Sequence, residues 1–345
     1  MRIRRLEKGE REEWLDLLDG WELLDGWRGG DYFRRPIEDD PSYEDANVWV
    51  VEEAGRLVCS VQIFPRELGA SGVRVPTGGI GTVYTRPDRR GAGIASALLE
   101  RSVEDMRARG MEISLLFAAR IPFYERLGWR SWPVRRDLLR RNAGATPTAG
   151  GSGLVIERFA PERDLDAVIA LHAETAAGLA GVETRDAASW RASLRLAGNP
   201  GEEFLVARAG RDRALLAYAR AIRLNEALTI AEHGLRDADA LAALCEAILA
   251  PREPDPLAPA EKPSAEFRSF AVLSVAADRA LLAALERRGV VCSSVEDPTP
   301  MLRCLDAQAL ARRLGLPPEP DTSCDAGLRR MLPPGRFSYW LADRF

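Results

Sequence analysis

Two hydrophobic periodicities alternate along residues 1–130. Runs in which apolar residues alternate or cluster briefly predict strands at Arg2–Leu6, Val48–Glu52, Leu57–Phe64, Ile80–Thr85 and Ile113–Ala118. Apolar residues spaced three and four apart predict helices at Glu10–Leu18, Ile94–Arg109 and Pro122–Leu127. Gly110 follows the central helix, as glycine often does at a helix C-terminus. This order of elements is typical of an α/β domain.

The pattern restarts in the second half without obvious sequence identity. It predicts strands at Leu154–Phe159, Glu203–Arg208, Leu215–Ile222, Ala227–Ala231 and Ser269–Ser274, and helices at Pro161–Ala177, Asp237–Leu249 and Arg279–Arg288. Between the halves lies a segment of small, Gly-, Pro- and Thr-rich composition that is typical of a linker. We therefore expect a domain at 1–142, a linker at 143–153, a second domain at 154–305 and a tail at 306–345.

The tail contains a short helical pattern and then four large aromatic residues: Phe337, Tyr339, Trp340 and Phe345. Leaving these rings in water would be unfavourable, so we expect the tail to dock on the rest of the molecule.

Composition excludes several classes of protein. The chain of 345 residues has a net charge of −4 and no broad basic field, which argues against a nucleic-acid partner. No run of about 18 apolar residues appears, so neither a membrane-spanning helix nor a membrane partner is expected. The start of the chain lacks the apolar core of a signal peptide, and we expect a cytoplasmic protein.

Cysteine and histidine are too scattered to suggest a metal site. The five cysteines form no CxxC pair, and the only histidines are His172 and His233. Free thiols in a reducing compartment, and no bound metal, are the expected state.

The most informative stretch runs from a strand into a helix through the letters TVYTRPDRRGAGIAS, Thr82 to Ser96. Unpaired N–H groups at a helix start attract anions, and Gly91 and Gly93 let the backbone approach one closely. Arg89 and Arg90 add positive charge. The stretch is neither a P-loop nor a GxGxxG fingerprint. A pyrophosphate cradle is one interpretation, and a tight turn with solvated arginines is the other.

The same stretch resembles the acyl-CoA motif of the GNAT acetyltransferase superfamily, [RQ]-x-x-G-x-[GA]. Arg90, Gly93 and Ala95 stand at its fixed positions. A second landmark of that superfamily, an aromatic pair followed by glycine and an aromatic, matches PFYERLGW at 122–129. The resemblance implies acetyl-CoA as co-substrate.

More narrowly, residues 48–132 resemble the Eis (enhanced intracellular survival) type. The resemblance implies an α/β (α+β) chain with two tandem GNAT folds, each a mixed, mostly antiparallel sheet flanked by helices, the second fold being degenerate. Members of this type carry a third domain that resembles a sterol carrier protein, for which the roughly 40 remaining residues are too few. Oligomers occur in this type, so a homo-oligomer is among the expected states.

The resemblance also implies roles for particular residues. The backbone of Val83, Tyr84 and Thr85 pairs with the pantetheine arm, and residues Gly91, Ala92, Gly93, Ile94, Ala95 and Ser96 bind the pyrophosphate. Tyr124 protonates the departing thiolate, for which a phenol with an ordinary pKa of about 10 is suitable. Packing of a short helix is the alternative role for Tyr124.

The Eis type uses its own C-terminal carboxylate as general base, which here implies Phe345. An α-carboxylate is a weak base unless it is desolvated, and a buried terminus meets that condition. A tail packed on the surface is the alternative.

The acceptor site has weaker signals. Carboxylates at Glu38, Asp39, Asp40, Glu44 and Asp45 either attract a cationic amine or form a solvated loop. The rings of Trp21, Trp27, Tyr32 and Phe33 either wall the acceptor pocket or pack in a core.

The second half lacks the Arg- and Gly-rich turn at the corresponding place, so one cofactor site per chain is expected.

Direct transfer of an acetyl group to the primary amine of a small molecule is the leading hypothesis. A non-catalytic acyl-CoA sensor and a protein or peptide acetyltransferase remain open.

Overall fold

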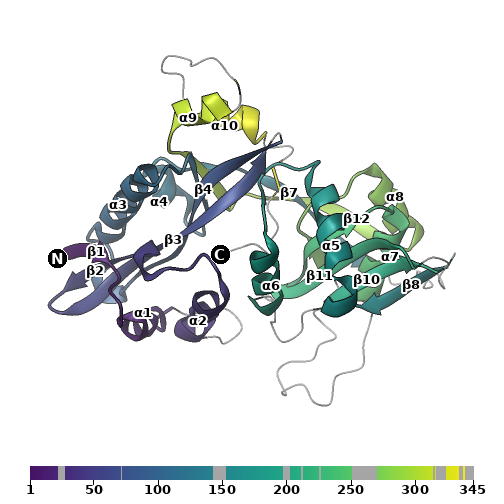
Figure 1. The fold of residues 1–345 in the computed structure, drawn as a ribbon, viewed down its shortest axis with the longest axis horizontal. Helices are drawn as coiled ribbons and strands as arrows, with labels where there is room; N and C mark the ends of the chain where they lie inside the picture. Colours follow the sequence, from purple (N-terminus) through teal and green to yellow (C-terminus); the bar gives the residue numbers. More distant parts are fainter. Residues whose placement is uncertain are drawn as a thin grey trace.

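Two mixed β-sheets, each covered by helices, make up the computed structural model (Figure 1). It describes residues 1–21, 28–70, 72–142, 153–196, 203–210, 213–224, 227–250, 270–313, 315, 324–333 and 337–338. This architecture confirms the expected α/β class with two sheets flanked by helices.

The first sheet has the order β1-β2-β3-β4-β5-β15-β6, with β9 paired to β3. Its strands are β1 (Arg2–Arg5), β2 (Val48–Glu53), β3 (Arg56–Ala70), β4 (Val73–Thr85), β5 (Ile113–Phe117), β6 (Arg130–Ser131), β9 (Val182–Glu183) and β15 (Pro300–Cys304). Helix α3 (Ile94–Ala108) buries its apolar stripe, including Leu98 and Leu99, on one face. Helices α1 (Arg11–Leu18) and α2 (Gly29–Asp39) cover the other face, where Trp14 and Leu18 are fully buried.

The second sheet has the order β14-β7-β13-β12-β11-β10-β8. Its strands are β7 (Val134–Arg141), β8 (Leu154–Arg158), β10 (Glu203–Ala209), β11 (Leu215–Leu224), β12 (Ala227–Leu235), β13 (Phe270–Leu273) and β14 (Val290–Asp297). Helices α7 (Ala238–Leu249) and α8 (Arg279–Arg287) pack on one face, in an apolar core that contains Leu244 and Leu285. Helix α5 (Pro161–Ala176) packs on the other face beside α6 (Ala187–Leu196).

The two sheets exchange strands, which the sequence did not indicate. Strand β7 lies within the expected first domain, 1–142, but pairs with β13 and β14 of the second sheet. Strand β15 lies within the expected second domain, 154–305, but pairs with β5 and β6 of the first. Each sheet therefore contains one strand from the other half of the chain. The two sheets do not coincide with the two segments on either side of residues 143–153.

The C-terminal segment contributes α9 (Ala307–Arg313) and α10 (Cys324–Met331), which Figure 1 shows beside the first sheet. Phe337 is buried and packs with Leu68, Trp132 and Leu332. Ser338 N donates to the carbonyl of Ala180 over 2.8 Å. Docking of this part of the tail therefore agrees with the expectation, whereas Tyr339, Trp340 and Phe345 lie outside the described residues.

Cysteine chemistry departs from the expectation at one position. Cys59, Cys245 and Cys292 are free thiols, as expected. Cys304, at the end of β15, is disulfide-bonded. The expectation of free thiols throughout is therefore wrong for this residue, because folding brings β15 close to a second cysteine that the sequence spacing does not suggest.

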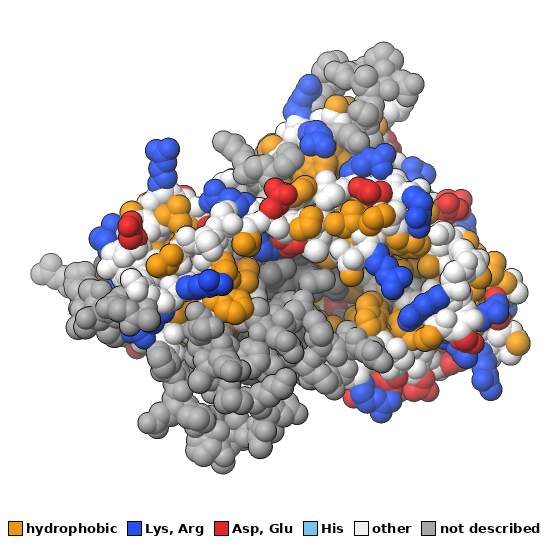
Figure 2. Space-filling model, turned by 180° about the vertical axis from the view of Figure 1, so that it is seen from behind, with side chains coloured by type: hydrophobic (Ala, Val, Ile, Leu, Met, Phe, Trp, Pro, Cys, Tyr) orange, Lys and Arg blue, Asp and Glu red, His pale blue; other side chains and the backbone are white. Residues whose placement is uncertain are grey.

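The described surface carries charges of both signs. On the face shown in Figure 2, basic and acidic side chains are interspersed with hydrophobic ones. Val291 and Val295 on the edge strand β14 are among the exposed large hydrophobic residues. Among the described helices, none has the length and apolar character that crossing a bilayer requires.

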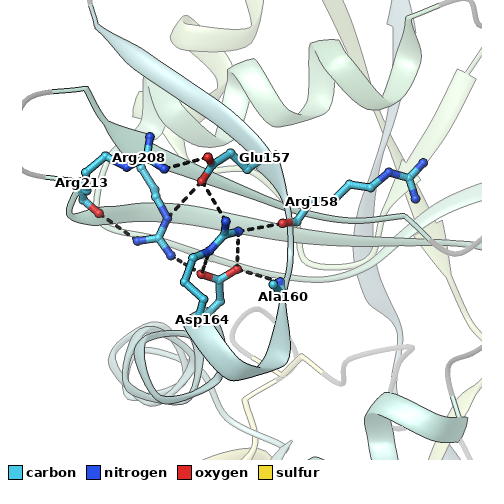
Figure 3. A network of polar contacts seen from close by, with 7 residues as sticks. Glu157, Arg158, Ala160, Asp164, Arg208 and Arg213 are labelled. Atoms are coloured by element: carbon cyan, nitrogen blue, oxygen red, sulfur yellow. Dashed lines mark hydrogen bonds and ion pairs between the residues drawn. The ribbon is translucent and has the colours of Figure 1, made fainter.

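A buried ion-pair network fixes α5 to the second sheet (Figure 3). The carboxylate of Asp164, fully buried near the start of α5, accepts hydrogen bonds from Arg163, from Arg208 on β10 and from the backbone N–H of Ala160. Burial disfavours the charged carboxylate, but these hydrogen bonds outweigh it and lower the pKa of Asp164. The charged pair therefore joins α5 to β10 in the folded state.

Replacement of Asp164 tests the network. Asp164→Ala leaves the buried guanidinium of Arg208 without its carboxylate partner, and we expect it to lower the free energy of unfolding by about 3 kcal/mol. Because the folded-state pKa is depressed, the stabilisation is present at neutral pH and is lost as pH falls below about 4. Urea unfolding of wild type and variant, at neutral pH and below about pH 4, measures the difference in the free energy of unfolding. The control is Asp239→Ala, which removes an exposed pair with Arg287 and should cost less than about 1 kcal/mol. Equal losses in the two variants would contradict this account.

Candidate functional site

A β-bulge shapes the end of strand β4. The β3–β4 register pairs Tyr84 with Ser60 but Gly81 with Gln62, so two residues of β4 lie opposite one of β3. Thr82, within the bulge, has a φ of 44°, which is rare for a β-branched residue. The Ser60 hydroxyl donates to the carbonyl of Thr82 over 3.0 Å and so stabilises the bulge. The bulge changes the direction of the backbone just before Val83.

Strands β4 and β5 separate at the same place. Their parallel ladder joins Thr77 to Ile113, Gly78 to Ser114 and Gly79 to Leu115, and it contains no later pair within residues 72–142. On its other edge, β5 pairs with β15 along all its length, from Ile113 to Phe117. The backbone of β4 beyond Gly79 thus has N–H and C=O groups on its β5 side that this ladder does not use. Such an edge is suited to an extended ligand with amide groups.

The glycine turn leads directly into α3. Gly91 and Gly93 have φ values of 83° and 76°, and Gly93 is the N-cap residue of the helix. The helix start has no side-chain cap and no acidic residue in its first turn. Among the described residues, a Cβ atom at either glycine would meet nothing within 4 Å, so this part of the structure leaves the space over the turn open. The N–H groups of such a helix start, together with the helix dipole, are suited to an anion.

The two arginines of the motif have partners on the protein. Arg89 forms an ion pair with Glu53. Arg90 Nε donates to the carbonyl of Thr85 over 3.1 Å, and its guanidinium lies 5.8 Å from the centre of the Tyr84 ring. The side chain of Arg90 is thus placed beside the end of β4, whereas the charge of Arg89 is balanced by Glu53 of β2.

Neighbouring residues of β4 face opposite sides of the sheet. Val83 packs in the same apolar cluster as Ala95 and Tyr124. Tyr84 is buried on the other side, stacked on Trp21 at 5.9 Å. The structure therefore brings one predicted backbone segment, the helix start and Tyr124 to a common cluster.

Tyr124 lies on the five-residue helix α4 (Ile121–Glu125). Its ring meets Phe123 and Trp129 edge-on, with centroids 4.9 and 6.2 Å away. Burial raises the pKa of Tyr124 to about 12, and the nearby charge of Arg120 opposes this rise. The phenol therefore remains protonated throughout the neutral range, as a proton donor must.

The expected acceptor residues divide into two groups. Trp21 and Phe33 pack against each other at 5.3 Å at the edge of a core, while Tyr32 is exposed. Trp27, like the predicted base Phe345, lies outside the described residues.

The acidic stretch is partly neutralised within the protein. Asp40 pairs with Arg66 at 2.6 Å, and Asp45 pairs with Arg11 at 2.5 Å. Arg66 also contacts Glu183 of β9 at 3.2 Å. Arg66 therefore joins the two halves of the chain through Glu183, and Asp40 is its partner within the first half, a role that the sequence context of Asp40 did not suggest.

The second half has the corresponding strand and helix, but its own residues form hydrogen bonds to the backbone groups at the strand gap and at the helix start. Strands β12 and β13 also pair in parallel for three residues. Beyond the last pair, Ser274 N donates to the carbonyl of Ile230 and its hydroxyl donates to that of Ala231. The carboxylate of Asp237 caps α7 by accepting from Ala240 N over 2.7 Å. The second strand gap is bridged, and the second helix start already holds an anion.

Some features of the site could not be predicted from the sequence. The Thr82 bulge has no local signal, because threonine is an ordinary strand residue. The hydroxyl of Ser60 is likewise recognised only once the strands are paired. Among the described residues, no group of three His, Cys, Asp or Glu side chains is arranged to hold a metal ion.

Comparison with known proteins agrees with this geometry. Residues 2–131 match the family described as the acetyltransferase (GNAT) domain. A curated relative, a mycothiol acetyltransferase of Thermobispora bispora, is 30% identical over 145 residues, which are 39% of this chain and 48% of that protein. The match thus spans about half the length of the relative.

Solved structures extend the similarity of fold to both halves. A probable N-acyltransferase of unknown function from Enterococcus faecalis V583 has a TM-score of 0.66 at 18% identity, covering 90% of this chain and 74% of that one. Eis1 from Mycobacterium abscessus has a TM-score of 0.59 at 17% identity, covering 90% and 75%. The tandem arrangement expected from the Eis-type resemblance is therefore present in the fold.

The ionisation of Tyr124 can be measured directly. Tyr124→Phe should remove one tyrosine that ionises near pH 12, because the apolar surroundings of the partly buried ring disfavour the charged form. Absorbance of tyrosinate, followed from about pH 9 upwards in wild type and variant, gives the difference, while circular dichroism over the same range shows whether the fold persists. A difference curve centred near pH 10 in the folded protein would contradict the assigned environment.

Proposed function

We propose that the chain is an acetyl-CoA-dependent N-acetyltransferase that transfers an acetyl group to the primary amine of a small molecule. The observation that supports this most is the combination of an uncapped glycine turn at α3 with the part of β4 that lies beyond its last described pair with β5. The matched GNAT acetyltransferase domain covers both features. The relative named as a mycothiol acetyltransferase is compatible with a small acceptor.

Acetyl-CoA would bind along the first domain alone. The backbone of Val83, Tyr84 and Thr85 would pair with the pantetheine amides, and the N–H groups of residues 91–96 would hold the pyrophosphate. The charges of Arg89 and Arg90 would favour the same phosphates. In the second half, Ser274 bridges the corresponding strand gap and Asp237 caps the corresponding helix. These contacts support one cofactor site per chain.

The reaction would proceed by direct attack in a ternary complex. The amine nitrogen forms a bond to the thioester carbonyl carbon, the oxyanion is held by backbone N–H groups near Val83, and the carbon–sulfur bond then breaks. The sulfur takes the phenolic proton of Tyr124, and the surplus proton of the amine passes to water or a base. The apolar cluster that raises the pKa of Tyr124 would raise that of the thiol as well, so the departing thiolate would be more basic there than in water, while the phenol would be a weaker acid.

A charge placed in the cradle tests cofactor binding. Ser96 lies in the first turn of α3, where an aspartate stabilises a helix by its dipole but repels a pyrophosphate. Ser96→Asp should therefore leave the melting temperature unchanged or higher while weakening acetyl-CoA binding by about tenfold or more. Calorimetric titration measures both affinity and stoichiometry, which should be one per wild-type chain.

The matched control is Ser189→Asp, at the same position of helix α6 in the second half. It should leave affinity unchanged. Equal weakening by both substitutions, or two sites per chain, would argue against the assigned cradle. No binding by the wild-type protein would refute the proposed function.

Removal of the phenolic hydroxyl tests the chemical step. Tyr124→Phe keeps the ring packing, so acetyl-CoA affinity should remain within about twofold while the rate of thiol release falls by about 10²-fold or more. Thiol release is assayed with a panel of small amines and with lysine-containing peptides. Turnover with peptides but not with small amines would indicate a peptide acetyltransferase. Binding of acetyl-CoA without any turnover would indicate a non-catalytic sensor.

A further inference from the structure

The helix that carries Tyr124 is held by a strand from the far end of the chain. Strand β15 lies between β5 and β6, and it pairs Leu302 with Leu115 on one side and with Arg130 on the other. Its next residue, Arg303, reaches the turn that follows α4. The candidate acid and the side chain that contacts its turn are thus separated by almost 180 positions in sequence.

Arg303 satisfies a backbone group at the end of α4. Its guanidinium donates a hydrogen bond to the carbonyl of Leu127. Leu127 N and Trp129 N in turn donate to the carbonyl of Tyr124 over 3.0 and 3.2 Å. Helix ends leave carbonyls without helical partners, and a helix of five residues has little internal stability of its own. An external donor at this point therefore restrains the whole turn.

A second contact runs through the aromatic rings. The guanidinium of Arg303 lies 5.0 Å from the centre of the Trp129 ring, whose edge-on neighbour is the ring of Tyr124. Gly128, with a φ of 87°, permits the close approach, since a Cβ there would lie 3.2 Å from Arg303 Nε. Arg303 thus contacts both the backbone and the ring that border Tyr124.

We propose that Arg303 is a positioning residue for Tyr124, through which the C-terminal half of the chain completes the catalytic site of the N-terminal half. Its guanidinium is planar and has several N–H donors. By restraining the Leu127–Trp129 turn, it fixes the direction in which the phenol of Tyr124 points. This inference rests on the proposed acetyl transfer for its catalytic consequence, whereas the restraint of the turn does not depend on it.

Arg303→Met tests the proposal, because methionine keeps much of the side-chain volume but removes the donors and the charge. We expect kcat to fall about tenfold, as for a slightly misplaced catalytic group, with the KM for acetyl-CoA within about twofold. Arg303→Lys keeps the charge without the planar fork and should restore only part of the rate. Hydrogen exchange of residues 121–129 should be faster in Arg303→Met.

The control is Arg329→Met, which removes a guanidinium 5.0 Å from the ring of Trp132, away from α4. It should leave both exchange and kcat unchanged. The decisive variant combines Arg303→Met with Tyr124→Phe. If Arg303 acts through the phenol, its loss should slow the Tyr124→Phe enzyme by less than about twofold.

The possible results separate the two proposals. Absence of acetyl-CoA binding and turnover in the wild-type protein refutes the proposed function, and with it the catalytic role of Arg303. Wild-type turnover with an unchanged kcat in Arg303→Met overturns the positioning role alone. An equal loss of rate in the wild-type and Tyr124→Phe backgrounds overturns it as well, because a general structural effect would then be responsible.

Discussion

The separation of β4 from β5 is the constraint on which the rest of the site depends. Each backbone edge in a folded chain needs hydrogen-bond partners, and β5 satisfies its outer edge along its whole length with β15. Its inner edge pairs with β4 over only three residues. A β-bulge with a positive φ at Thr82 follows in β4 just beyond this point. Val83 at the end of the strand, Ala95 at the helix start and Tyr124 all border the same apolar cluster.

The two halves show how small side-chain differences decide what a shared fold can bind. In the first half, the helix start has glycine at its N-cap and no acidic residue in its first turn. In the second half, Asp237 supplies the anion from the protein itself, and Ser274 occupies the strand gap. The same backbone plan therefore leaves an open anion site in one half and a closed one in the other. The closed half contributes instead through Glu183 and Arg303, which contact the first half.

Much of the local structure was predictable, because local patterns determine it. The strand-to-helix order and the ends of α3 follow from hydrophobic periodicity and from Gly93 and Gly110. Strand β4 begins earlier than expected, at Val73, although Pro76, Gly78 and Gly79 are poor strand formers. Pairing with β3 and β5 overrides these preferences. Gly78 is needed there, since a Cβ would lie 2.1 Å from the sulfur of Met106 on α3.

The sequence by itself determined the glycine turn, and its resemblance to GNAT acetyltransferases implied the class of the first domain and Tyr124 as the candidate acid. These features depend on residues that are close together in the chain, so they can be recognised from the sequence without a structure. Only the tertiary structure decided the exchange of β7 and β15, the pairing of Asp40 with Arg66, and the contact between Arg303 and the turn after Tyr124. These contacts join distant positions, and nothing in a single sequence records which distant strands will satisfy one another's hydrogen bonds.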